Sequence, residues 1–270
     1  GGALYAAASG RVSSTPVGRQ IGVALTAATA AGGKIPAIMY GPKGGNDMLS
    51  ARGYQFEYFD DFNTGWDDTA TVGDYVETSD GTPAVDIGDA SHGVLSIACG
   101  GTDNNETYIN TMHEIYLFET DNYAFFEARV KLTEANTDDA NICIGLSDTV
   151  GADTLVDDGA GPAASYDGCL LYKVDGTMSW SFETSNAGTQ NTLAVLGTYA
   201  SATWYRVGFF YDYNDGVTAS VTPYLDGVAG TAQDLVIAGL AEMHILMGVK
   251  AGGGNAETLL VDYVHLAAER

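Results

Sequence analysis

Basic residues are scarce in this chain. Only 11 Lys and Arg stand against 35 Asp and Glu in 270 residues, which gives a formal net charge of −24. A body this acidic repels nucleic acid and anionic lipid, so we expect neither as a direct ligand. Apolar residues never run uninterrupted for about 18 positions, the length that a membrane-spanning helix requires. We therefore expect no membrane segment.

Motifs that carry common chemistry are also missing. The cysteines, Cys99, Cys143 and Cys169, lack the C-x-x-C spacing of a zinc site and are predicted to be small buried hydrophobes. No G-x-S-x-G nucleophile elbow occurs, and no glycine cluster is followed by Lys-Ser or Lys-Thr as in a phosphate loop. We expect structural roles for the histidines, which are His92, His113, His244 and His265.

The few basic residues are unevenly distributed. Residues 1–52 contain five of the 11 basic residues and one of the 35 acids, Asp47, so their net charge is +4. The remaining residues hold six basic and 34 acidic groups, a net charge of −28. Such a split indicates two parts with different surroundings.

The residues that are abundant favour β structure. Residues 1–45 are predicted to form short strands, because glycine and proline interrupt every helical window. Residues 46–53 are the natural linker. From residue 54 to 270, polar and apolar residues alternate in short runs between Gly, Asp and Asn turns, most clearly in YAFFEARVKLTE at 123–134. The chain is therefore predicted to be all-β, with a small N-terminal β module ahead of two packed antiparallel sheets.

Two of these strands carry a family resemblance. YAFFEARVKL at residues 123–132 and LLVDYVHL at 259–266 resemble an early strand and the closing strand of laminarinase-like glycoside hydrolases and related jelly rolls. The resemblance covers residues 59–266. It implies a concanavalin A-like, two-sheet antiparallel jelly-roll sandwich, a fold that serves many functions.

The catalytic pattern of those enzymes is absent. Retaining glycosidases of this fold alternate their carboxylates along one strand, as E-x-D-x-x-E or E-x-D-x-E, because the chemistry needs two carboxylates roughly 5 Å apart on one face. The equivalent region, GCLLYKVDGTMSWSFE, has Leu170, Leu171 and Tyr172 where acids would stand. Its acids are Asp175, in a turn, and Glu183. We therefore expect that the chain is not an enzyme.

The N-terminal segment has a resemblance of its own. IGVALTAATAAGGKIPAIMYG, residues 21–41, resembles the small β modules of tailed-phage head decoration and cement proteins. That resemblance implies a virion structural protein on the outer capsid surface, with the major capsid protein as partner and a homotrimer as the oligomeric state. The capsid-anchoring residues would then be the basic ones of the module, Arg11, Arg19, Lys34 and Lys43.

A carbohydrate-binding module is the alternative function. Aromatic side chains stack on sugars, and Trp180, Trp204 and Tyr211 are the candidate contacts on the concave sheet. The same alternating aromatics also stabilise packing between neighbouring strands, so both interpretations remain open.

Calcium is the one metal that the acid-rich loops suggest. Calcium takes six to eight oxygen ligands, and the turn at Asp212, Asn214 and Asp215 brings three oxygen-bearing side chains together. None of the acidic loops has the spacing of an EF-hand, and ordinary turn chemistry explains them equally well. We expect no other cofactor.

Overall fold

In the computed structural model, the described residues are 2–6, 12–13, 20–24, 37–39, 54–63, 71–72, 74–87, 93–120, 122–136, 138–213 and 218–269. The chain divides into two compact units, with the boundary between Gln55 and Phe56. The predicted linker, residues 46–53, lies outside the described residues.

The first unit contains a four-stranded antiparallel sheet. The strand order is β2 (Val12–Ser13), β1 (Gly2–Ala6), β3 (Gln20–Ala24) and β4 (Ala37–Met39). A small N-terminal β module is therefore present, as predicted.

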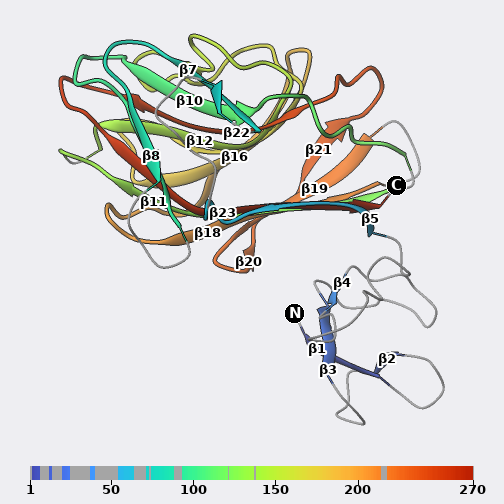
Figure 1. Ribbon diagram of the computed structural model, residues 1–270. Helices are drawn as coiled ribbons and strands as arrows, with labels where there is room; N and C mark the ends of the chain where they lie inside the picture. The colour runs from blue at the N-terminus through green and yellow to red at the C-terminus, as the bar shows by residue number, and fades with distance from the viewer. Residues whose placement is uncertain are drawn as a thin grey trace. The chain divides into compact units, whose positions relative to one another are not determined.

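The second unit is a sandwich of two large antiparallel sheets, drawn as the two layers of Figure 1. The eight-stranded sheet has the order β17 (Thr189–Thr198), β16 (Ser179–Asn186), β15 (Gly168–Lys173), β12 (Ala140–Ser147), β22 (His244–Ala251), β10 (Glu106–Thr111), β7 (Tyr75–Ser79) and β6 (Thr71–Val72).

The nine-stranded sheet faces it. Its main path is β20 (Val228–Ala229), β19 (Thr218–Leu225), β18 (Tyr205–Asp212), β11 (Tyr123–Thr133), β23 (Thr258–Glu269), β9 (Leu95–Ala98) and β8 (Ala84–Ile87). Two further strands, β21 (Gln233–Val236) and β5 (Tyr54–Asp60), pair with β19 and β23. A separate hairpin joins β13 (Leu155–Val156) to β14 (Gly161–Pro162). The described residues contain no helix, so the predicted all-β, two-sheet class is confirmed.

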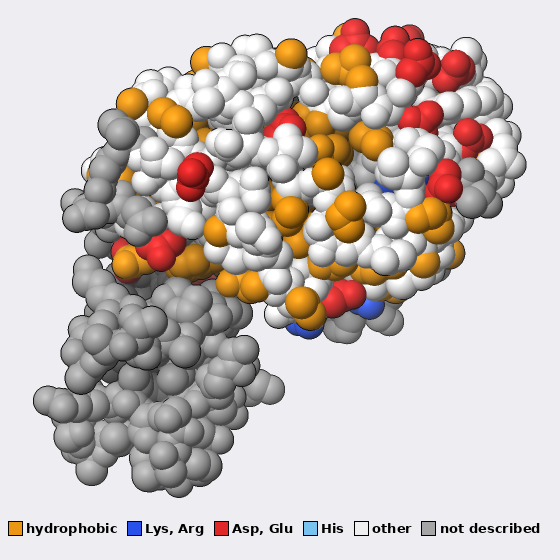
Figure 2. All heavy atoms as spheres, turned by 180° about the vertical axis from the view of Figure 1, so that it is seen from behind, with side chains coloured by type: hydrophobic (Ala, Val, Ile, Leu, Met, Phe, Trp, Pro, Cys, Tyr) orange, Lys and Arg blue, Asp and Glu red, His pale blue; other side chains and the backbone are white. Residues whose placement is uncertain are grey.

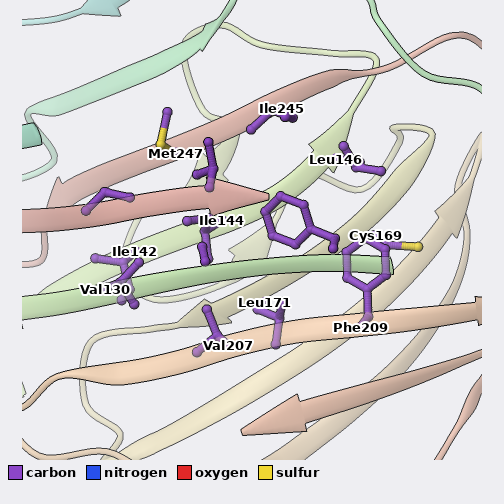
Figure 3. Close-up of a cluster of buried hydrophobic side chains, with 14 of the residues drawn as sticks. Val130, Ile142, Ile144, Leu146, Cys169, Leu171, Val207, Phe209, Ile245 and Met247 are labelled. Atoms are coloured by element: carbon purple, nitrogen blue, oxygen red, sulfur yellow. The ribbon is translucent and has the colours of Figure 1, made fainter. Parts of the chain in front are cut away.

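The core lies between the two sheets and follows the alternation of the sequence. Along β11, every second residue from Ala124 to Leu132 is at most 1 % exposed. Figure 3 shows Val130, Val207 and Phe209 from the nine-stranded sheet directed towards Ile142, Ile144, Leu171 and Met247 from the eight-stranded sheet. Burying a side chain of this size contributes about 1.5–3 kcal/mol. The alternation of β11 thus fixes which face of the sheet closes the core.

Candidate functional site

The outer face of the eight-stranded sheet is the natural place for a site, because a sandwich normally leaves its outer faces to solvent. Here the middle of that face is buried. Alternate side chains of β10, β22, β12 and β15 form a second apolar cluster with Leu155 and Tyr166, and none of its members is more than 7 % exposed: Tyr108, Leu246, Cys143, Leu170 and Tyr172. The covering segment, residues 148–167, includes the β13–β14 hairpin and lies over this face.

One end of the covering segment is fixed by a buried lysine. The Nζ of Lys250 on β22 lies 2.5 Å from Oδ1 of Asp157, 3.1 Å from Oδ1 of Asp153 and 3.2 Å from Oε2 of Glu106. It also donates to the carbonyl oxygen of Leu155 at 2.8 Å. Burial lowers the pKa of Lys250, but the hydrogen bonds to Asp157 and Asp153 outweigh it and the pKa is raised. The ammonium group therefore stays charged and holds the segment against the sheet.

The other end is fixed by a buried carboxylate. Glu183 on β16 is 5 % exposed and accepts hydrogen bonds from Tyr166 Oη at 3.2 Å, Gln190 Nε2 at 2.8 Å and Thr192 Oγ1 at 2.5 Å. Burial raises the pKa of Glu183, and the hydrogen bonds from Thr192 and Tyr166 partly offset that rise. Both oxygens of Glu183 are thus engaged in holding the structure.

These carboxylates are not arranged for glycoside hydrolysis. Glu106 lies on β10 and Glu183 on β16, with β22, β12 and β15 between them. Four strand spacings separate the two groups by roughly 19 Å, against roughly 5 Å for a retaining pair. At the positions where acids were sought, Leu170 and Tyr172 lie in the covered cluster and Leu171 lies in the core.

Two of the predicted sugar contacts are wrong. Trp180 and Tyr211 are both 0 % exposed, because the alternation of β16 and β18 directs them into the core. The Trp180 ring packs edge-on against Tyr205, and the Tyr211 ring stacks on Phe118 with centroids 4.4 Å apart. No sugar can reach either ring in this structure.

Trp204, the third predicted contact, is half-buried, just ahead of β18. The Arg129 guanidinium carbon lies 4.5 Å from its ring centroid and the Lys131 ammonium 5.1 Å. Arg129 also forms an ion pair with Asp262 at 2.6 Å. The Trp204 ring therefore already serves as a platform for two cations, and a sugar contact there stays a prediction.

The remaining predicted sites are mostly outside the described residues. Of the proposed calcium ligands only Asp212 is described, and burial raises the pKa of its carboxyl group. Among the described residues, no group of three or more His, Cys, Asp or Glu is placed to hold a metal ion. Asn214, Asp215 and the predicted capsid-anchoring residues lie outside the described parts of the chain: Arg11, Arg19, Lys34 and Lys43.

The prediction that the three cysteines are buried is confirmed. Cys99, Cys143 and Cys169 are free and buried. Burial raises the pKa of each thiol, so none is a ready nucleophile. The described part of the chain also holds no helix long and apolar enough to cross a membrane.

A buried ionic cluster lies at one end of the sandwich, where sequence reasoning did not place a site. Lys173 on β15 points into the core, and its Nζ donates to Oε1 of Glu134 at 2.5 Å and to the Ala140 carbonyl at 2.9 Å. Glu257 is fully buried, and its carboxylate accepts one hydrogen bond, from the amide of Ala135 at 2.8 Å. Within the described residues, Oε2 of Glu134 and Oε1 of Glu257 have no hydrogen-bond partner.

Within this cluster, the carboxyl group of Glu257 has a raised pKa. Burial, with the nearby charges of Glu134 and Asp139, raises its pKa to about 7, while the Ala135 hydrogen bond and Lys173 act in the opposite direction. The sequence signal for the cluster is the lysine of GCLLYK, since period-two alternation puts Lys173 on the face of Cys169 and Leu171. The two glutamates come from loops, for which alternation predicts no facing.

Comparison with solved structures places the fold. An endo-1,3-beta-glucanase from Streptomyces sioyaensis superimposes with a TM-score of 0.50 at 13% identity, over 81% of this chain and 97% of the other. The Emp47p carbohydrate recognition domain gives a TM-score of 0.50 at 12% identity, over 82% and 98%. A protein of unknown function from Shewanella oneidensis MR-1 gives 0.51 at 17% identity, over 79% and 86%. At such identities the likeness establishes the fold alone, which is the predicted concanavalin A-like jelly roll.

No protein-family model matches the chain, and no curated protein matches it.

Proposed function

We propose that the chain is a non-enzymatic structural protein of a virion head, in which residues 1–45 attach to the major capsid protein and the sandwich projects outward. The observation that carries the non-enzymatic part is the covered face. Residues 148–167 fill the outer face of the eight-stranded sheet, and its buried carboxylates hold that segment in place. A face closed in this way supports a structural role better than turnover of a polymer.

Charge supports the attachment. A segment at +4 can meet an acidic protein surface, while a body at −28 stays hydrated and repels its neighbours. The resemblance of residues 21–41 to head decoration modules supports the same assignment. By analogy with those modules, the assembly on the capsid is a homotrimer, and the outer capsid surface is its location.

Deleting residues 1–45 tests the attachment. In particles grown from a phage genome with this deletion, we expect the heads to assemble without the chain, because the remaining body at −28 has no anchor. The chain-to-capsid ratio is measured by quantitative mass spectrometry of purified particles. A full-length variant with Arg11, Arg19, Lys34 and Lys43 replaced by glutamine separates charge from shape, and we expect it to be lost from particles too. Truncated chain at the full copy number overturns the proposal.

Carbohydrate binding is the second candidate. The fold shared with the Emp47p carbohydrate recognition domain and the half-exposed Trp204 ring favour it. A glycan array probed with the full chain separates the two candidates. Binding that Trp204→Ala abolishes favours the glycan role, and a blank array with a folded chain favours the structural one.

A further inference from the structure

The edges of the two sheets are formed by β17, β6, β20, β21, β8 and β5, and β17 differs from the rest. β6 and β20 have two residues each, β8 and β21 have four each, with one aspartate in each, and β5 has seven, two of which are acidic. β17 has ten residues, Thr189–Thr198, with no charged residue and no proline. Short edges and charged side chains are the usual protection against pairing with another chain. β17 has neither.

At β21, an edge strand of the nine-stranded sheet, backbone groups are already occupied by hydrogen bonds. The backbone carbonyls of Asp234 and Val236, both on β21, accept hydrogen bonds from side chains of the eight-stranded sheet. Thr184 and Asn191 bind the first carbonyl, and Asn186 binds the second. β17 pairs with β16 along one side only, and within the described residues no strand pairs with its other side.

β17 and the residues that flank it in the sequence carry no charge. No Asp, Glu, Lys, Arg or His occurs from residue 184 to 205, in a chain whose net charge is −24. Figure 2 shows one face of the molecule, on which many acidic side chains gather towards one end and others are scattered among hydrophobic and uncharged side chains.

Among the residues that the structure describes, the two most exposed large hydrophobic side chains lie on strands that meet here. Val195 on β17 is 65% exposed and Val228 on β20 is 71% exposed. The strands are close together, since a Cβ added to Gly230 after β20 would lie 2.4 Å from Leu196 of β17. Likewise, a Cβ added to Gly197 of β17 would lie 2.4 Å from Leu225 of β19. The two edges thus lie side by side, with β17 open and uncharged, and the acids beside them include Asp226, in the turn before β20, and Asp234 on β21.

We propose that this surface binds a second copy of the same chain, with β17 pairing antiparallel to β17 of that copy across a two-fold axis. A second copy is the occupant that the charges favour. Two sandwiches at −28 repel wherever their acids face each other, so close approach is easiest along a strand that carries no charge, as β17 does. An edge strand also complements itself in antiparallel pairing, as an isologous interface requires.

The register between β17 and β16 indicates which half of β17 pairs with the second copy. The ladder with β16 is regular from Leu193 to Thr189 and shifts between the partners of Phe182 and Trp180, near Ala194–Leu196. Such an irregularity bends a strand and interrupts its outer edge. Residues 189–193 therefore supply the backbone hydrogen bonds, while Val195 and Val228 supply apolar contact beside them.

Sedimentation of the full chain tests this. We expect the double variant Val195→Asp/Val228→Asp to sediment as a particle of half the mass of the wild-type particle, because four carboxylates then face one another across the two-fold axis. Met112→Asp is the matched control, since Met112 is an exposed hydrophobic residue, at 37%, beside a different strand. We expect it to keep the wild-type mass. Equal masses for the wild-type chain and the double variant overturn the proposal, including when both are trimers formed through another part of the chain.

Salt and hydrogen exchange give two further readouts. Because the opposing force is repulsion between like charges, we expect association to strengthen from 50 to 500 mM NaCl as the charges are screened. Weakening over that range points to ion pairs and overturns the proposal. We also expect the amides of residues 189–193 to exchange more slowly at high protein concentration. Unchanged exchange there, with the mass doubled, places the interface elsewhere and overturns it too.

Discussion

Replacing Lys173 with methionine should lower the free energy of unfolding by about 3–5 kcal/mol, the usual effect of removing one partner of a buried ion pair. Lys173 is fully buried, and its ammonium group is the cation bound to Glu134, whose side chain is 1% exposed. Methionine fills a similar volume, so the loss is one of charge rather than of packing. Since whole domains are stable by only about 5–15 kcal/mol, an effect of this size is readily measured by urea unfolding.

Two matched variants make that result interpretable. Lys131→Met removes a half-buried lysine whose ammonium lies over the Trp204 ring, and we expect a change of about 1 kcal/mol or less. Lys173→Met combined with Glu134→Gln removes both charges, and we expect it to recover part of the lost stability. If Lys173→Met unfolds at the same urea concentration as Lys131→Met, the buried ion pair does not hold this end of the sandwich together.

Glu257 should make the chain more stable in mild acid than in mild base. Its pKa is about 7 in the folded chain against an ordinary value of 4.5 for a glutamate, so between these pH values the folded chain binds the extra proton. Folding is then favoured by lowering the pH, and the gain accumulates from about pH 7 down to about pH 4.5. The full difference is about 3 kcal/mol. Urea unfolding at pH 5 and pH 8 measures it.

Glutamine at position 257 provides the control. Glu257→Gln keeps the shape of the protonated acid, so we expect it to be more stable than the wild-type chain at pH 8 and close to it at pH 5. Lower pH also relieves the general repulsion of a chain at −24, which both proteins share, so the difference between them isolates Glu257. An exposed acid, Glu114→Gln, should leave the pH dependence unchanged. A constant difference between wild type and Glu257→Gln across this range contradicts the assignment.

The sandwich was predictable because alternation is a local signal with a global consequence. In β11, the residues Ala124, Phe126, Ala128, Val130 and Leu132 read directly as the buried face. Alternation does not reveal what else covers a strand. Leu170 and Tyr172 alternate with Leu171, and only the structure shows that residues 148–167 close the outer face above them.

For two aromatic residues, residue type and alternation give different predictions. Residue type alone favours Trp180 and Tyr211 as sugar contacts, although their strands place them with the buried positions Phe182 and Phe209. Weighing the alternation of those strands above residue type would have assigned both to the core. The ionic cluster was only half accessible to such reasoning, since Lys173 lies on a strand but Glu134 and Glu257 come from loops.

Electron cryomicroscopy of the intact particle tests the central claim most directly. The structural proposal predicts density for a two-sheet sandwich outside the capsid shell, joined to it through the N-terminal module, at every site that the chain occupies. Heads whose outer surface carries no such density, in particles shown by mass spectrometry to contain their complete set of structural proteins, contradict it.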